Sequence, residues 1–277
     1  MARRFRGPPD WALYAGGLAA LVVAAVWLDE NADAPPAPAA PGAVEAALLG
    51  PVTPFDPAVV VDAPTDSAPP QAGTAFSIAA EGRWITARHV VEGCRRPALM
   101  VGGARAVAAD VRLAPHADLA LLITHGGPPA VPLRPPSRLR KDALAFHPGY
   151  PRGSAGEISS RLIGETVFRH HGRGHGAERV LVWAEVGRTT GLEGSLAGLS
   201  GAPALDEQGR VIGVTVAEAP RRGRIYTTTP HDLALAVSGQ ADADVRPGGA
   251  VTVENYGRAA DDLRRNLRVA QAVCLPG

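Results

Sequence analysis

Apolar residues in most of the chain occur in short runs that are separated by glycine, acidic or small polar residues. The segment TAFSIAAEGRWITA, residues 74–87, contains two such runs with Glu81 and Gly82 between them, which predicts a β-hairpin. Further strands are predicted in DLALLIT (118–124), RVLVWAEV (179–186) and RVIGVTVAE (210–218). No long amphipathic helices alternate with these strands, so the pattern predicts an all-β barrel or sandwich domain.

The N-terminal pattern is different. Residues 11–28 carry no charge, and as a helix they span roughly 27 Å, close to the roughly 30 Å hydrocarbon core of a bilayer. Three arginines precede this run and two acidic residues follow it. This asymmetry predicts a single-pass anchor with the rest of the chain outside the cytoplasm, which in a bacterium means an inner-membrane anchor and a periplasmic or extracytoplasmic domain.

Two alternatives to an uncleaved anchor are open. Ala32-Asp33-Ala34 has the small residues of a signal-peptide cleavage site, although Pro35 directly after it disfavours cleavage. A buried core helix is the other alternative, but it leaves the charge asymmetry and the segment that follows unexplained.

Residues 29–72 are rich in alanine and proline, which is typical of an extended spacer. The apolar patch PVTPFDPAVVVDA (51–63) within it is expected to pack on the next domain as an edge strand. The expected organisation is a basic cytoplasmic N-terminus (1–10), an anchor (11–28), a linker (29–72), a folded domain (73–237) and a tail that packs on this domain (238–277).

Composition limits the functional classes. The chain has 277 residues, 46% of them hydrophobic, which is enough to bury a sizeable core. Its net charge of +1 gives no indication of a nucleic-acid partner. Nothing in the sequence indicates an oligomeric state.

The candidate chemistry centres on Ser200 in the uncharged segment LAGLSGAPAL. A serine hydroxyl becomes a good nucleophile when a histidine takes its proton and a buried carboxylate orients that histidine. His89, in ITARHVVEGC, follows a predicted strand where a short helical turn begins, and Asp118, in HADLALL, stands where a strand begins. The chain order is therefore His, Asp, Ser.

The nucleophile elbow of α/β-hydrolases is a rival interpretation of the same serine. That elbow requires a helix directly after the serine and the chain order Ser, Asp, His. Here Pro203 and a predicted hairpin with Gly209 at its turn follow Ser200, and the downstream pair His231-Asp232 is adjacent in sequence. The elbow is therefore rejected.

Three segments, GTAFSIAAEGRWITARHVV, HADLALL and GLSGAPALDEQGRVIGV, resemble the signature segments of trypsin-like serine proteases of the chymotrypsin fold, nearest to the bacterial HtrA/Deg-like branch. The resemblance covers roughly residues 73–237. It implies two six-stranded β-barrels with a cleft between them, and a serine endopeptidase that acts on protein or peptide substrates without a metal or organic cofactor.

The resemblance also implies the role of each residue. His89 is the general base, Asp118 orients it, Ser200 is the nucleophile, and the N–H groups of Gly198 and Ser200 form the oxyanion hole. Leu199 stands where trypsin-like digestive enzymes carry an aspartate, so activation by a new N-terminus is not expected. No PDZ-like domain is expected after the protease domain. A catalytically silent binding or sensor module of the same fold is the alternative function.

The substrate pocket is the less specific part of the resemblance. Its floor is implied near Gly194, with Ser195 beside it, and substrate is expected to add a strand alongside Val216, Ala217 and Glu218. The uncharged floor favours a small or aliphatic residue before the scissile bond, whereas the Glu218 carboxylate would attract basic side chains.

The two cysteines, Cys94 and Cys274, are expected to form a disulfide in an oxidising compartment, with two buried free thiols as the alternative. In the tail, a helix that ends near Arg265 is expected to precede a short strand that brings Cys274 back to the first barrel. His170, His171 and His175 are assigned to a solvated glycine-rich loop and not to a metal site.

Overall fold

The computed structural model of the protein describes residues 47–50, 59–62, 72–102, 105–171, 177–242, 245 and 248–276. The predicted anchor, residues 11–28, and most of the predicted linker lie outside the described residues. Within the described ranges, no helix is long and apolar enough to span a bilayer.

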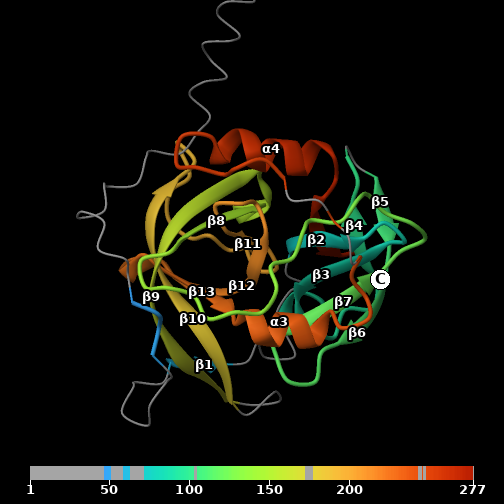
Figure 1. Ribbon diagram of the computed structural model, residues 1–277. Helices are drawn as coiled ribbons and strands as arrows, with labels where there is room; N and C mark the ends of the chain where they lie inside the picture. The colour runs from blue at the N-terminus through green and yellow to red at the C-terminus, as the bar shows by residue number, and fades with distance from the viewer. Residues whose placement is uncertain are drawn as a thin grey trace, which may run out of the picture.

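Two β-barrels lie side by side (Figure 1). The first contains seven strands in the spatial order β5-β4-β14-β2-β3-β7-β6. Their bounds are β2 (Gly73–Ala79), β3 (Arg83–Ala87), β4 (Pro97–Met100), β5 (Ala106–Ala108), β6 (Asp110–Leu113), β7 (Leu119–Ile123) and β14 (Val269–Cys274). In the part of the chain that is described, no pairing joins β5 to β6, so this barrel is nearly closed.

The second barrel is closed by six strands, because β9 pairs with both β10 and β8. These strands are β8 (Leu144–Gly149), β9 (Gly156–His171), β10 (Ala177–Arg188), β11 (Pro203–Leu205), β12 (Val211–Ala219) and β13 (Arg224–Thr228). A further strand, β1 (Val59–Asp62), pairs in parallel with the end of β9. The predicted edge strand of the linker region is thus present on this barrel.

Three α-helices and two 3-10 turns complete the described elements: α2 (Arg88–Val91), α3 (Pro230–Ala236), α4 (Tyr256–Arg265), η2 (Pro151–Gly153) and η3 (Pro220–Arg222). Thr229 caps α3 by accepting a hydrogen bond from the Asp232 N–H, and Pro230 occupies its first turn. Helix α4 packs against β8 and β9 of the second barrel and against β14 of the first.

Alternating side chains of the strands form the core. Trp183, Ile158 and Leu162 are fully buried inside the second barrel, and Phe76 and Leu119 are fully buried in the first. Each such side chain contributes roughly 1.5–3 kcal/mol by its removal from water. Burial of these side chains therefore stabilises the two barrels, and the segments between them are attached to these barrels.

The C-terminal tail corrects the expected strand count. β14 pairs with β2 on one side and with β4 on the other, so it is an internal strand of the first barrel. The first barrel therefore has seven strands instead of the expected six, because this late segment takes the place beside β2. The predicted helix that ends near Arg265 and the strand after it are both confirmed.

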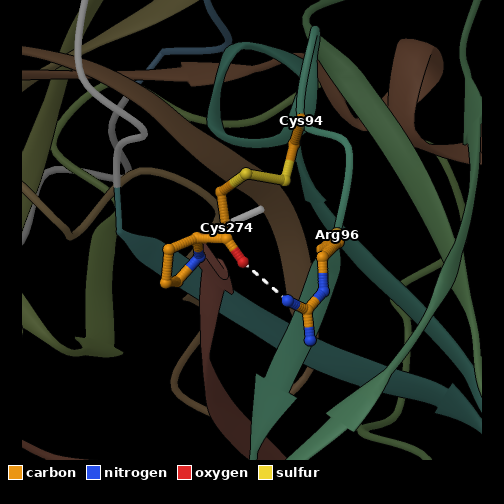
Figure 2. The surroundings of a disulfide bond; sticks show 4 residues. Cys94, Arg96 and Cys274 are labelled. Atoms are coloured by element: carbon orange, nitrogen blue, oxygen red, sulfur yellow. Dashed lines mark hydrogen bonds between the residues drawn. A yellow bond between two sulfur atoms is a disulfide. The ribbon is translucent and has the colours of Figure 1, made fainter.

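The predicted disulfide between Cys94 and Cys274 is present, with the two Cα atoms 5.7 Å apart. Beside it the Arg96 guanidinium donates a hydrogen bond of 2.7 Å to the carbonyl oxygen of Pro276 (Figure 2). The end of β14 is thus joined to the segment that follows α2.

The histidine-rich segment differs in part from its prediction. His170 and His171 belong to the end of β9, and they pair with Val61 and Asp62 of β1 instead of lying in a loop. The addition of β1 extends the ladder to these positions. His175 lies outside the described residues.

Candidate active site

His89 and Asp118 are brought together by the pairing of two strands of the first barrel. Ala87 at the end of β3 pairs with Leu119 at the start of β7, so the residues just beyond this pair face each other. The Asp118 carboxylate accepts hydrogen bonds from the His89 backbone N–H (3.0 Å) and from His89 Nδ1 (2.6 Å). Its carbonyl oxygen accepts from the Arg88 N–H. The histidine is therefore oriented through its backbone and its ring.

The electrostatics of this pair favour the protonated form of His89. Burial by itself lowers the pKa of His89, but the charge and the hydrogen bond of Asp118 outweigh it and raise this pKa above 6.5. The carboxylates of Glu178 and Glu92 raise it further. The His89 side chain is 22% exposed, so the pair is in part accessible to solvent.

The turn around Ser200 packs against the start of the same barrel. The Ser200 carbonyl accepts a hydrogen bond from the Thr74 N–H (2.8 Å), and the Gly201 N–H donates to the Thr215 carbonyl (2.7 Å). A Cβ on Gly201 would lie 1.9 Å from the Thr74 oxygen and 3.0 Å from the Ala87 nitrogen. Only glycine fits here, and its φ of +88° also requires glycine. The serine is thus held next to the segment that carries His89.

The peptide between Ala197 and Gly198 is oriented by a hydrogen bond from the η2 turn. The Ala197 carbonyl accepts a hydrogen bond from the Arg152 N–H in η2. Because the C=O and N–H of a trans peptide point in opposite directions, the Gly198 N–H faces away from this loop. Gly198 has φ +98°, and a Cβ there would lie 2.5 Å from the Tyr150 oxygen. Within the described ranges, neither the Gly198 N–H nor the Ser200 N–H has a hydrogen-bond partner.

A cavity of about 580 Å³ adjoins Ser200. Its lining comes from the η2 turn, the serine loop and strands β12 and β13, and comprises Ala72, Arg152, Gly153, Leu196, Ala197, Gly198, Leu199, Ser200, Thr215, Ala217, Glu218 and Ile225.

Not all of the expected pocket residues line this cavity. Gly194 and Ser195 are exposed and lie outside the lining, and Val216 is buried in the core between the barrels. Ala217 and Glu218 line it. Ser195 instead holds the Glu218 carboxylate: its Oγ donates to one carboxylate oxygen (2.6 Å), and the Leu196 N–H donates to the other (2.7 Å).

Two contributors to the site have no signal in the sequence pattern. Glu178 on β10 accepts a hydrogen bond of 2.7 Å from the Asp118 N–H, although the two residues are 60 positions apart. Arg152 holds the Ala197–Gly198 peptide through its backbone N–H, which any residue except proline would supply. Pairing of segments across the two barrels is a tertiary property, and a local pattern does not reveal it.

A second histidine–serine contact lies inside the second barrel. His147 Nε2 lies 2.7 Å from Ser160 Oγ, and its Nδ1 lies 3.0 Å from Thr215 Oγ1. His147 and Ser160 are both 0% exposed, and burial lowers the pKa of His147 to about 3. A substrate cannot reach this serine, and both ring nitrogens are already occupied. We therefore assign this contact to the core.

No three histidine, cysteine or acidic side chains of the described residues are grouped so that they could hold a metal ion.

Two barrels with a His–Asp pair and a serine loop between them define the class of chymotrypsin-fold peptidases. A family model for the trypsin-like peptidase domain matches residues 73–214. The chain belongs to this family.

The comparisons with individual proteins give more distant likenesses. An uncharacterized protein, y4bJ of Sinorhizobium fredii (strain NBRC 101917 / NGR234), is 29% identical over 195 residues, which are 68% of this chain and 29% of that protein. The chain therefore spans less than a third of the length of that relative.

Two solved structures have a similar fold at low sequence identity. The active form of the Rv3671c protease from M. tuberculosis has a TM-score of 0.48 and 20% identity, covering 74% of this chain and 100% of that one. The HtrA-type protease AlgW with a decapeptide has a TM-score of 0.48 and 19% identity, covering 60% of this chain and 50% of that one.

Proposed function

We propose that this protein is a serine endopeptidase in which His89 is the general base, Asp118 orients it and Ser200 is the nucleophile. The observation that carries the proposal is the 2.6 Å contact between His89 Nδ1 and Asp118. In the nearby loop 196–201, the N–H groups of Gly198 and Ser200 have no hydrogen-bond partner among the described residues, which supports it. Family membership of the same segment supports it.

The mechanism follows from these positions. His89 Nε2 takes the proton of Ser200 as Oγ attacks the scissile carbonyl carbon, and Asp118 stabilises the imidazolium that results. The Gly198 and Ser200 N–H groups stabilise the negative charge that develops on the carbonyl oxygen. His89 then protonates the leaving amine as the peptide bond breaks. In the second half of the reaction His89 takes a proton from the water that attacks the acyl-enzyme, and returns it to Ser200 Oγ as the acid product leaves.

Labelling with a fluorophosphonate tests the assignment of the nucleophile. We expect the wild-type protein to be labelled and Ser200→Ala to be unlabelled. Ser160→Ala is the matched control, because Ser160 also contacts a histidine but is fully buried. Labelling that is lost in a folded Ser160→Ala variant and kept in Ser200→Ala would contradict the proposal.

A binding or sensor module with a misaligned resting triad is the second candidate function. It is favoured by one observation: among the described residues, no hydrogen bond joins the side chains of Ser200 and His89. Such contacts are often long in ligand-free enzymes and tighten when substrate binds. Wild-type protein that stays unlabelled across the pH range would support the second candidate.

We propose that the primary pocket takes a small or aliphatic side chain. Leu196, Ala217 and Ile225 form apolar walls, and both oxygens of Glu218 already accept local hydrogen bonds. Cleavage of an unbiased peptide library by the wild type and by Glu218→Gln tests this. The same aliphatic preference in both supports the proposal, whereas a basic preference that disappears in Glu218→Gln contradicts it.

We further propose that the substrate backbone pairs with β12. On one side, Ala217 and Glu218 pair with β13. On the other side, β11 pairs with residues 211–214 only, so the described strands leave the edge from Val216 onward free for an added strand. The same library, made with N-methylated backbones before the scissile bond, should be cleaved poorly.

We also propose that residues 11–28 anchor the protein in a bacterial inner membrane with the protease domain in the periplasm. The charge asymmetry around this segment and the disulfide between Cys94 and Cys274 support the proposal. The full chain should remain in carbonate-washed membranes and be digested by external protease in spheroplasts. A full chain that appears in the soluble fraction would contradict it.

A further inference from the structure

A carboxylate from the second barrel reaches the catalytic pair of the first. Glu178 lies at the start of β10, is 6% exposed, and accepts a 2.7 Å hydrogen bond from the Asp118 backbone N–H. The long β9–β10 hairpin carries this residue across the boundary between the barrels. Asp118 belongs to the first barrel, and a residue of the second barrel holds its backbone.

Asp118 is held by hydrogen bonds at its N–H, its carbonyl and its carboxylate. Its N–H donates to Glu178, its carbonyl accepts from the Arg88 N–H, and its carboxylate accepts two bonds from His89. A residue held at its N–H, its carbonyl and its carboxylate has little freedom to rotate away from the imidazole ring.

The backbone of Glu178 is held by strand pairing next to a core residue. Glu178 pairs across the hairpin with Phe168, whose ring lies 4.9 Å from that of Tyr226 in the core between the barrels. Phe168 also pairs with Val59 of β1. The position of the carboxylate is therefore determined by packing and by two strand pairings.

We propose that Glu178 is a positioning residue for the catalytic pair: its carboxylate, reaching from the second barrel, holds the Asp118 backbone and adds negative charge beside His89. The proposal deepens the proposed function and rests on it. Glu178 acts through Asp118 and is not placed in contact with substrate.

The charge of Glu178 gives the role a measurable signature. The charged groups that act on His89 are Asp118 before β7, Glu178 on β10 and Glu92 next to α2. Removal of any one of these negative charges destabilises the imidazolium, so it lowers the pKa at which His89 becomes protonated. A residue with a purely structural role would leave this pKa unchanged.

Glu178→Gln keeps a hydrogen-bond acceptor and removes the charge, whereas Glu178→Ala removes both. We expect Glu178→Gln to shift the acid limb of the pH profile of kcat/KM to lower pH with little change in KM. We expect Glu178→Ala to lose in addition about tenfold or more in kcat, because the buried Asp118 N–H is left without its partner.

Glu165→Gln is the matched control. Glu165 is a partly buried glutamate on the adjacent strand β9, and it is paired with Arg179 at a separate cavity. Fluorescein-labelled casein is the substrate, and thermal unfolding checks that each variant is folded. Glu165→Gln should keep the wild-type pH profile.

A titration that does not depend on activity separates this inference from the proposed function. The pKa of His89 is followed by NMR in the full chain carrying Ser200→Ala, and the His89 signal is assigned by its loss in His89→Gln. A lower pKa in Glu178→Gln, with none in Glu165→Gln, supports the inference even if the wild type cleaves nothing. An unchanged His89 pKa in a folded Glu178→Gln protein would overturn it.

Discussion

His89 and His147 are both histidines in short contact with an oxygen atom, yet their surroundings give them opposite properties. His89 faces the Asp118 carboxylate, which raises its pKa despite the opposing effect of burial. His147 faces two hydroxyl groups in a fully buried position, and burial lowers its pKa to about 3. Burial without a charged partner therefore leaves a histidine neutral, whereas a neighbouring carboxylate favours its protonated form.

The two histidines also contribute to stability with opposite signs. The raised pKa of His89 stabilises the fold below the unfolded value of 6.5, and this contribution is lost as the pH rises through the folded value. The lowered pKa of His147 has the opposite effect: stability is present above pH 6.5 and is lost as the pH falls toward about 3.

Substitution of each histidine should separate chemistry from packing, and this is the largest expected effect. His89→Ala should lower kcat/KM by roughly 10⁴ or more with little change in folding, because the members of a triad act as a unit. His147→Ala should destabilise the fold, while the folded fraction, counted by fluorophosphonate labelling, keeps most of its rate. If His89→Ala and His147→Ala lost the same fraction of the rate per folded molecule, this comparison of the two histidines would be wrong.

Acid should destabilise the protein mainly through His147. A fall of its pKa from 6.5 to about 3 corresponds to at most about 5 kcal/mol lost at low pH. Urea unfolding at pH 7 and pH 4 should show a smaller difference in unfolding free energy in His147→Gln than in the wild type. The same difference in both proteins would show that this histidine is not the acid-sensitive group.

The disulfide stabilises the region of His89 more directly than the region of His147. Cys94 lies shortly after His89 in the chain, whereas both cysteines are far in sequence from His147. Cys94→Ser with Cys274→Ser should cost about 2–5 kcal/mol of unfolding free energy, since the closed loop spans a separation of 180 residues. Denaturant unfolding with and without reductant measures this. A wild type with an unchanged transition under full reduction would contradict it.

The smallest expected effect concerns Glu92, whose carboxylate also raises the pKa of His89 but is paired with Arg88 near the surface. Glu92→Gln should shift the acid limb of kcat/KM slightly to lower pH, by less than Glu178→Gln. The shift should shrink in high salt, because exposed charges are screened. A larger shift for Glu92 than for Glu178 would reverse the assigned order of the two carboxylates.

Much of the first barrel could be predicted from the sequence. The β2–β3 hairpin, the helical turn at His89 and the strand after Asp118 follow from alternating apolar residues and turn residues that are close together in the chain. Gly198 and Gly201 could likewise be singled out, because a serine turn with positive φ on both sides requires glycine.

Other features could not be predicted because their partners are distant in sequence. β14 reads as a short strand, but its place between β2 and β4 depends on which edges the rest of the barrel leaves open. The spacing of Ser195 from Ser200 in the sequence predicts a pocket residue, yet its side chain donates a hydrogen bond to Glu218 on β12.

The sequence by itself determined the all-β class, the residues His89, Asp118 and Ser200 with their order, and the two cysteines that can pair. These depend on residue type and on short spacing, which a local pattern records. Only the tertiary structure decided that the Glu178 carboxylate accepts from Asp118, that the Arg152 N–H donates to the Ala197 carbonyl and that His147 is a core residue. Each of these depends on how distant segments of the chain pack, and burial and backbone pairing between such segments leave no periodic signal in the sequence.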